Sequence, residues 1–65
     1  MQGRKKIMSL ADVYKAEIKR LQLLKNGIEA MVMNKPVVNK TMADLYVKEG
    51  QYEIANILLF EDEEI

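Results

Sequence analysis

Large apolar residues return every seven positions through the first half of the chain, and this repeat restricts the fold more than any other feature. One row holds Ile7, Tyr14, Leu21 and Ile28, and the row three positions further along holds Leu10, Glu17, Leu24 and Met31. A third row, Ala11, Ile18, Lys25 and Val32, is also mostly apolar. A seven-residue repeat places its members along one side of an α-helix. Because the stripe is wider than a two-stranded seam, the repeat predicts a long helix that faces a bundle.

We expect this long helix to cover residues 9–33. Ser9 is a suitable N-cap, and Asp12 follows three positions later as its acidic partner. Asn26-Gly27 is a turn dipeptide and leaves open a break at this point. The repeat continues past the dipeptide without a change of phase, which favours one continuous helix.

A loop and two shorter helices are expected after the long helix. Pro36 disfavours helix at the residue before it and therefore ends the long helix. Asn39 is a suitable N-cap for a second helix, and Gly50 stands where a left-handed residue would end it. A third helix is expected over residues 51–61, with one apolar face formed by Tyr52, Ala55, Leu58 and Leu59.

The residues on both sides of Gly50 follow a definite order. Tyr46 stands near the end of the first short helix, and Gly50 supplies the turn. Tyr52 then begins the next helix, and the small Ala55 lets the two backbones approach. In this order the segment from Pro36 to Leu59 resembles a single tetratricopeptide helix pair. The resemblance implies a hairpin packed through Leu45, Tyr46, Gly50, Tyr52, Ala55 and Leu59. No second repeat is found, so the peptide groove of tetratricopeptide arrays is not implied.

The expected fold class is therefore all-α, with a long amphipathic helix followed by a short antiparallel helical hairpin. It forms one small domain, divided into a basic flexible start (1–8), the long helix (9–33), the hairpin (39–61) and an acidic tail (62–65). A long helix of about 25 residues spans roughly 37 Å, whereas the hairpin spans roughly 16 Å. Much of the apolar stripe would then need a second chain to cover it.

The small size of the chain also favours self-association. A 65-residue chain buries too little surface to be very stable alone, and 0 Cys excludes disulfides and thiolate metal sites. We expect a homo-oligomer, most simply a symmetric dimer assembled as an intermolecular helical bundle or coiled coil. Its expected interface consists of Ile7, Leu10, Tyr14, Ile18, Leu21, Leu24, Ile28 and Met31. Glu17 interrupts this row, either as a solvated position or as a polar residue that sets the register with a partner chain.

Charge is distributed unevenly along the chain, although the formal net charge is +0. Residues 1–25 hold seven basic and two acidic residues, a net of +5, and residues 26–65 hold three basic and eight acidic residues, a net of −5. The basic half suggests an alternative function as a small nucleic-acid-binding regulatory protein. Its phosphate contacts would be Arg4, Lys5, Lys6, Lys15, Lys19 and Arg20.

Catalysis is not expected, because 0 His and 0 Cys remove the usual general base and the thiol nucleophile. We also expect no cofactor and no metal. No apolar run approaches the roughly 20 residues of a membrane span, and no secretory signal is found, so we expect a cytoplasmic protein without membrane contact. Met31 and Met33 are interpreted as gap-filling core, with an adaptable contact surface as the alternative. The expected function is protein–protein interaction, as an assembly or regulatory adaptor module.

Overall fold

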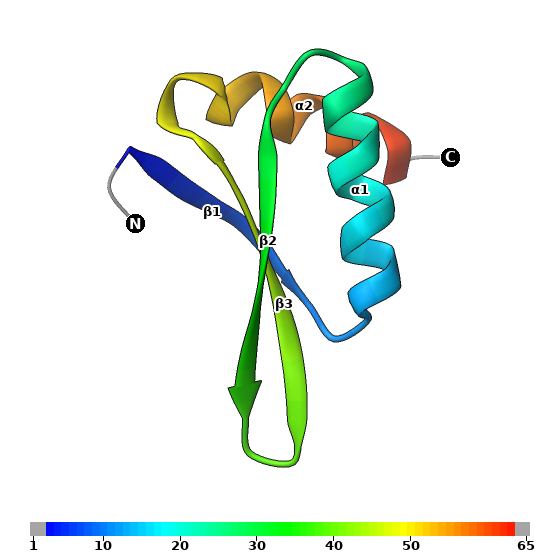
Figure 1. Ribbon diagram of the computed structural model, residues 1–65. Helices are drawn as coiled ribbons and strands as arrows, with labels where there is room; N and C mark the ends of the chain where they lie inside the picture. Colours follow the sequence, from blue (N-terminus) through cyan, green and yellow to red (C-terminus); the bar gives the residue numbers. More distant parts are fainter. Residues whose placement is uncertain (1–2, 64–65) are drawn as a thin grey trace.

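The computed structural model describes residues 3–63, with side chains up to residue 60. The chain forms β1 (Arg4–Leu10), α1 (Val13–Lys25), β2 (Ala30–Val37), β3 (Lys40–Lys48), a short 3₁₀ turn (Glu49–Gln51) and α2 (Tyr52–Glu63). The three strands make one antiparallel sheet in the order β1-β3-β2, with β3 in the middle (Figure 1). The protein is therefore a mixed α/β fold, and the all-α prediction is wrong.

Strand β3 is recognisable in hindsight by its alternation. Ala43, Leu45 and Val47 are fully buried on one side, and Met42, Asp44 and Tyr46 occupy the other side. Side chains of a strand alternate between the two faces of the sheet. Leu45 lies opposite Met8 of β1 and Val32 of β2, so the apolar residues of all three strands meet on one face.

Strand β1 departs from regular pairing at one residue. Its register with β3 shifts between Lys6 and Met8, which leaves Ile7 as an extra residue in the strand. Such a β-bulge places two neighbouring residues on the same side of the sheet more easily than a regular strand does. Ile7 and Met8 both pack against the core as a result.

Helix α1 has a well-formed cap at each end. The Asp12 carboxylate accepts hydrogen bonds from the backbone N–H groups of Tyr14 and Lys15, at 2.9 and 3.3 Å. At the other end Gly27 has φ +80°, and the Ile28 N–H donates to the Leu23 carbonyl at 2.9 Å. These are the features of a Schellman motif, in which a left-handed residue ends the helix and an apolar contact accompanies the turn. The chain therefore leaves the helix at Asn26-Gly27.

The core lies between the sheet and the two helices, both of which pack on the same sheet face. Leu23 of α1 and Ala55 and Leu59 of α2 meet Leu45 and Val47 of β3 there, together with Ile28. The molecule is only 15 Å across in its thinnest dimension, against 33 and 32 Å in the others. One layer of helices on one layer of sheet accounts for this thickness, and the second sheet face is left uncovered.

Several local predictions are corrected by this fold. The long helix 9–33 is wrong: its residues form the end of β1, the shorter α1 and the start of β2. The basic start 1–8 was expected to be flexible, but from Arg4 onward it belongs to β1. Ser9 lies within that strand, so the N-cap of α1 is Asp12 instead. Pro36 lies in β2, where an edge strand tolerates a residue without an N–H.

The tetratricopeptide helix pair, the helical bundle and the coiled coil are also contradicted. The segment expected to be the first helix of the pair is the central strand β3, and Asn39 has φ 69° in the two-residue turn between β2 and β3. Gly50 lies in the 3₁₀ turn and does not have a positive φ. The helix expected over 51–61 agrees with α2, and its expected apolar face does pack on the core. Of the expected acidic tail, Asp62 and Glu63 continue α2, and residues 64–65 lie outside the described chain.

Candidate functional site: an open sheet face and an exposed helix stripe

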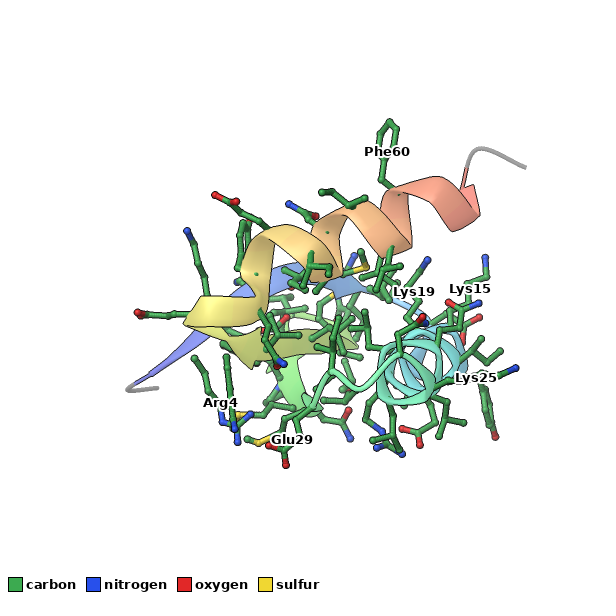
Figure 2. All side chains as sticks on the ribbon, turned by 90° about the horizontal axis from the view of Figure 1, so that it is seen from above. Arg4, Lys15, Lys19, Lys25, Glu29 and Phe60 are labelled. Carbon is green, nitrogen blue, oxygen red and sulfur yellow. The ribbon has the colours of Figure 1, made fainter. Side chains whose placement is uncertain are left out.

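The sheet face turned away from the helices is the first candidate surface, and we call it the open sheet face. The pairing of the strands brings side chains on this face together in rows: Tyr46 lies between Lys6 and Met31, and Asp44 lies between Ser9 and Met33. The face consists of Arg4, Lys6 and Ser9 from β1, Met31, Met33, Lys35 and Val37 from β2, and Lys40, Met42, Asp44, Tyr46 and Lys48 from β3. In Figure 2, Arg4 lies on the opposite side of the sheet from α2.

The centre of the open sheet face is apolar. Met31, Met42 and Tyr46 are half-buried there, and Met33 is 46% exposed. Three methionines and one tyrosine form a soft surface that can adjust its shape to a partner. The interpretation of Met31 and Met33 as gap-filling core is not supported by their position on this face.

A buried carboxylate lies in the middle of the open sheet face. Asp44 is only 3% exposed, and its Oδ1 accepts a short hydrogen bond from the Ser9 hydroxyl. The Lys6 ammonium lies 3.9 Å from its Oδ2. A buried carboxylate is costly unless it is paired, so Ser9 and Lys6 are needed to hold Asp44 in place. The bulge at Ile7 helps, because it brings both partners to the same part of the sheet.

An exposed ion pair lies at one end of the open sheet face. The Lys48 ammonium lies 3.1 Å from the Glu29 carboxylate, which belongs to the loop before β2. The hydrogen bond from Lys48 lowers the pKa of the Glu29 carboxyl, with a smaller contribution from the nearby positive charge of Arg4. Figure 2 shows Arg4 and Glu29 projecting on the same side of the molecule.

The outer side of α1 is the second candidate surface. Tyr14, Ile18, Leu21 and Leu24 project there, with 83, 56, 49 and 51% of each residue exposed, and we call this row the α1 stripe. Ala16 and Leu23 on the inner side of the same helix are fully buried. Glu17 borders the stripe. The Nε–H of Arg20 donates a hydrogen bond to the Glu17 carboxylate at 2.9 Å, and this bond lowers the pKa of the Glu17 carboxyl. An exposed apolar row of this length is typical of an interaction surface.

Helix α2 carries a smaller exposed row. Ile54, Ile57 and Phe60 are each more than half exposed, and they follow one another at three-residue intervals along the outer side of the helix. Figure 2 shows Phe60 projecting away from the rest of the molecule. Both helices therefore combine a buried inner side with an apolar outer side.

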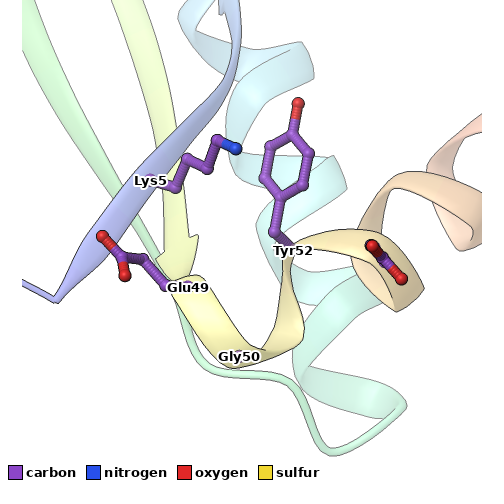
Figure 3. A pocket seen from close by; sticks show the side chains of 5 residues that line it. Lys5, Glu49, Gly50 and Tyr52 are labelled. Atoms are coloured by element: carbon purple, nitrogen blue, oxygen red, sulfur yellow. The ribbon is translucent and has the colours of Figure 1, made fainter.

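Two shallow hollows lie elsewhere on the described part of the chain. The larger one, of about 620 Å³, is lined by Lys5, Glu49, Gly50, Tyr52 and Glu53 (Figure 3). The Lys5 ammonium lies 4.2 Å from the centre of the Tyr52 ring, a cation–π contact that ties β1 to the start of α2. The smaller one, of about 370 Å³, lies between the end of β1 and α1 and is lined by Leu10, Lys15, Ile18, Lys19 and Gln22.

The expected oligomer interface is divided by the fold. The structure brings Tyr14, Ile18, Leu21 and Leu24 together on one exposed surface. Ile7 packs against the core in β1, Ile28 is buried, and Met31 belongs to the open sheet face. Leu10 ends β1 and lines the smaller hollow.

The expected hairpin contacts are divided in the same way. Leu45, Ala55 and Leu59 do meet in the core, but across the sheet rather than between two helices. Tyr46 lies on the open sheet face, and Gly50 and Tyr52 line the larger hollow.

The six expected nucleic-acid contacts do not form one basic surface. Arg4 and Lys6 lie on the open sheet face, whereas Lys5 lies on the other side of the sheet over Tyr52. Lys15 and Lys19 line the smaller hollow, and Arg20 pairs with Glu17. The residues that the sequence-based reasoning missed are Ser9, Met42, Asp44 and Lys48. The alternation within residues 40–48 is the signal that would have placed the last three on one face.

Among the side chains that the structure describes, which end at residue 60, no three acidic groups lie together so that they could hold a metal ion. Within residues 3–63, neither helix is long and apolar enough to cross a membrane. Comparison with known proteins finds no matching family model, no matching curated protein and no matching solved structure.

Proposed function

We propose that this chain is a non-catalytic protein-interaction module that works as a symmetric homodimer through the α1 stripe. The observation that carries the proposal is the α1 stripe itself: four large apolar residues on the outer side of a helix whose inner side already fills the core. The free energy gained by covering them favours association. A cytoplasmic location, expected from the sequence, stays a prediction.

A second copy of the chain is a suitable occupant because the stripe is self-complementary. Leu21 lies at its centre, with Ile18 and Leu24 three residues away on either side. Glu17 and Lys25 lie four residues from Leu21, again on either side. In an antiparallel pair of α1 helices with a two-fold axis at Leu21, Glu17 of one protomer is level with Lys25 of the other. A two-fold axis repeats each such contact, so both charges of both protomers are matched.

The expected dimer is weak. Helix α1 has 13 residues, which corresponds to a length of about 20 Å. A pair of such helices buries less than the roughly 1,200–2,000 Å² of a standard stable interface. We therefore expect association that depends on protein concentration in the micromolar range and above.

Sedimentation of a Leu21→Glu variant tests the proposal. Leu21 is half exposed, so the substitution should leave the fold intact, as judged by circular dichroism. It should convert a concentration-dependent dimer into a monomer, because two buried carboxylates would face each other at the axis. Lys15→Ala makes the same one-unit change of net charge outside the stripe and should leave the dimer unchanged. A parent chain that is monomeric at every concentration would contradict the proposal.

A further inference from the structure

We propose that the open sheet face binds a segment of another protein that carries apolar and acidic side chains. This surface is separate from the α1 stripe, so the inference goes beyond dimerisation and does not depend on it. It rests on three properties of the face: its apolar centre, the sign of the charge at its margins, and the blocked edges of the sheet.

The apolar centre supplies the contact area. Met31 and Met33 of β2 lie beside Met42 and Tyr46 of β3, on the sheet face that no helix covers. Methionine is unbranched and polarisable, so a methionine-rich surface can fit partners of different shape. The hydroxyl end of Tyr46 supplies a hydrogen-bonding group within this apolar area.

The margins of the face are positive. Arg4 and Lys6 on β1, Lys35 on β2 and Lys48 on β3 surround the centre, against the carboxylates of Asp44 and Glu29. Both carboxylates already have a lysine partner. Positive potential surrounding an apolar centre is complementary to a segment whose apolar side chains are flanked by aspartate or glutamate.

The edges of the sheet favour binding over the face rather than extension of the sheet by an added strand. On β2, Pro36 removes one edge N–H. On β1, the bulge at Ile7 interrupts the regular pairing, and Arg4, Lys5 and Lys6 add charge. Bulges, prolines and lysines are the devices by which proteins prevent edge-to-edge pairing. A partner therefore reaches the open face without forming backbone ladders.

The same face is less suited to a single-stranded nucleic acid. Such ligands stack successive bases on several aromatic rings, and Tyr46 is the one aromatic residue on this face. Nucleic acid is therefore kept as an outcome of the test.

Methyl NMR of the full chain with labelled methionines tests the inference directly. Three probes are compared: the random copolymer of glutamate and tyrosine, polyglutamate, and a thymidine oligonucleotide. The copolymer should shift the methyl signals of Met31, Met33 and Met42. The signal of Met8, which packs on the core side of β1, serves as the internal control and should not shift.

Matched variants make the result decisive. Met33→Glu should weaken copolymer binding by about tenfold or more, because it places a carboxylate in the apolar centre. Val38→Glu makes the same charge change at a fully solvated turn, where Val38 is 85% exposed, and should have little effect. Leu21→Glu, the monomeric variant, should bind as the parent does. Loss of copolymer binding in Leu21→Glu would show that the open sheet face binds its ligand only in the dimer, and would contradict the independence of the open sheet face and the α1 stripe.

Three other outcomes overturn the inference. If polyglutamate binds as tightly as the copolymer, the face recognises charge alone. If the oligonucleotide binds more tightly than the copolymer and shifts the same three methyl signals, the ligand is a nucleic acid. If the methionine signals shift with protein concentration in the absence of any probe, the occupant of the face is a second copy of this chain.

Discussion

At the residue scale, Asp44 shows how one polar residue can be kept inside an otherwise apolar sheet. It lies in the central strand, and the Ser9 hydroxyl and the Lys6 ammonium satisfy its carboxylate from the neighbouring strand. Removing one partner of a buried charged group leaves the other without compensation, which costs more than the hydrogen bond itself contributes. Ser9 is therefore expected to matter for stability even though the residue as a whole is exposed.

Ser9→Ala should lower the free energy of unfolding by about 1–3 kcal/mol. Ser9→Thr keeps the hydroxyl and should recover most of this loss. Replacing both partners in Ser9→Ala/Asp44→Leu should cost less than the two single changes added together, because no unpaired carboxylate remains. Urea unfolding followed by circular dichroism measures the parent, the single variants Ser9→Ala, Ser9→Thr and Asp44→Leu, and the double variant. Additive losses would show that the serine and the aspartate are not coupled.

A second prediction at this scale concerns the glycines. Gly27 has φ +80° at the end of α1, and a Cβ added there would meet no other atom within 4 Å. Gly27→Ala should therefore lower the free energy of unfolding by about 1–2 kcal/mol, through backbone strain alone. Gly50 also has open space around its Cα but no positive φ, so Gly50→Ala is the matched control and should not destabilise. Equal melting temperatures of the two variants would contradict the left-handed cap.

At the element scale, the sequence predicted one of the two helices well and misread the strands. The face of α2 formed by Tyr52, Ala55, Leu58 and Leu59 was predictable because helical spacing and burial agree there. Residues 40–48 fit both periods: the apolar residues Met42, Ala43, Leu45 and Tyr46 recur at helical spacing, and Ala43, Leu45 and Val47 alternate. The local sequence pattern does not decide between helix and strand for a central strand such as β3, because the strands that pair with it are distant in sequence.

The seven-residue repeat was misleading for a related reason. Its members do not share one environment: Ile7 and Ile28 pack in the core from a strand and a loop, whereas Leu21 is exposed on the outer side of a helix. The turn dipeptide Asn26-Gly27 carried the correct information about the end of α1. The left-handed Gly27 and the Schellman hydrogen bonds end the helix there, although the seven-residue repeat continues beyond it. The open sheet face was not predictable before the strands were known, because its rows join residues from β1, β2 and β3.

The ion pair between Glu29 and Lys48 predicts how the loop before β2 responds to pH. The lysine lowers the pKa of Glu29 in the folded chain, so the pair contributes to stability at pH values above the ordinary glutamate pKa of about 4.3. This contribution is lost as the pH falls through the lowered pKa of the folded state. Both side chains are exposed, so the effect should be small and screened by salt. Glu29→Gln should reduce stability slightly at pH 7 in low salt and not at pH 2. An equal loss at both pH values would exclude the ion pair as its cause.

At the scale of the whole molecule, three surfaces lie around one thin core. The helices and the sheet share a single apolar layer, and the chain still exposes the α1 stripe, the outer row of α2 and the open sheet face. A small domain that exposes so much apolar surface gains stability when a partner covers it, by mass action as well as by contact area. The α1 stripe and the open sheet face share no residue, so dimerisation through α1 does not use the residues of the open sheet face.

The orientation of the proposed dimer gives the last prediction. If the two-fold axis passes at Leu21, position 17 of one protomer is level with Lys25 of the other. Glu17→Lys then places two lysines side by side at each end of the helix pair and should weaken the dimer. Lys25→Glu should weaken it similarly through two negative charges. The double variant Glu17→Lys/Lys25→Glu restores opposite charges between protomers, so its dissociation constant should return toward that of the parent. Within one helix, residues 17 and 25 are two turns apart, too far to pair, so a recovery must come from contact between chains. Sedimentation equilibrium at low salt measures the four chains. A double variant that is weaker than either single change would exclude the antiparallel arrangement.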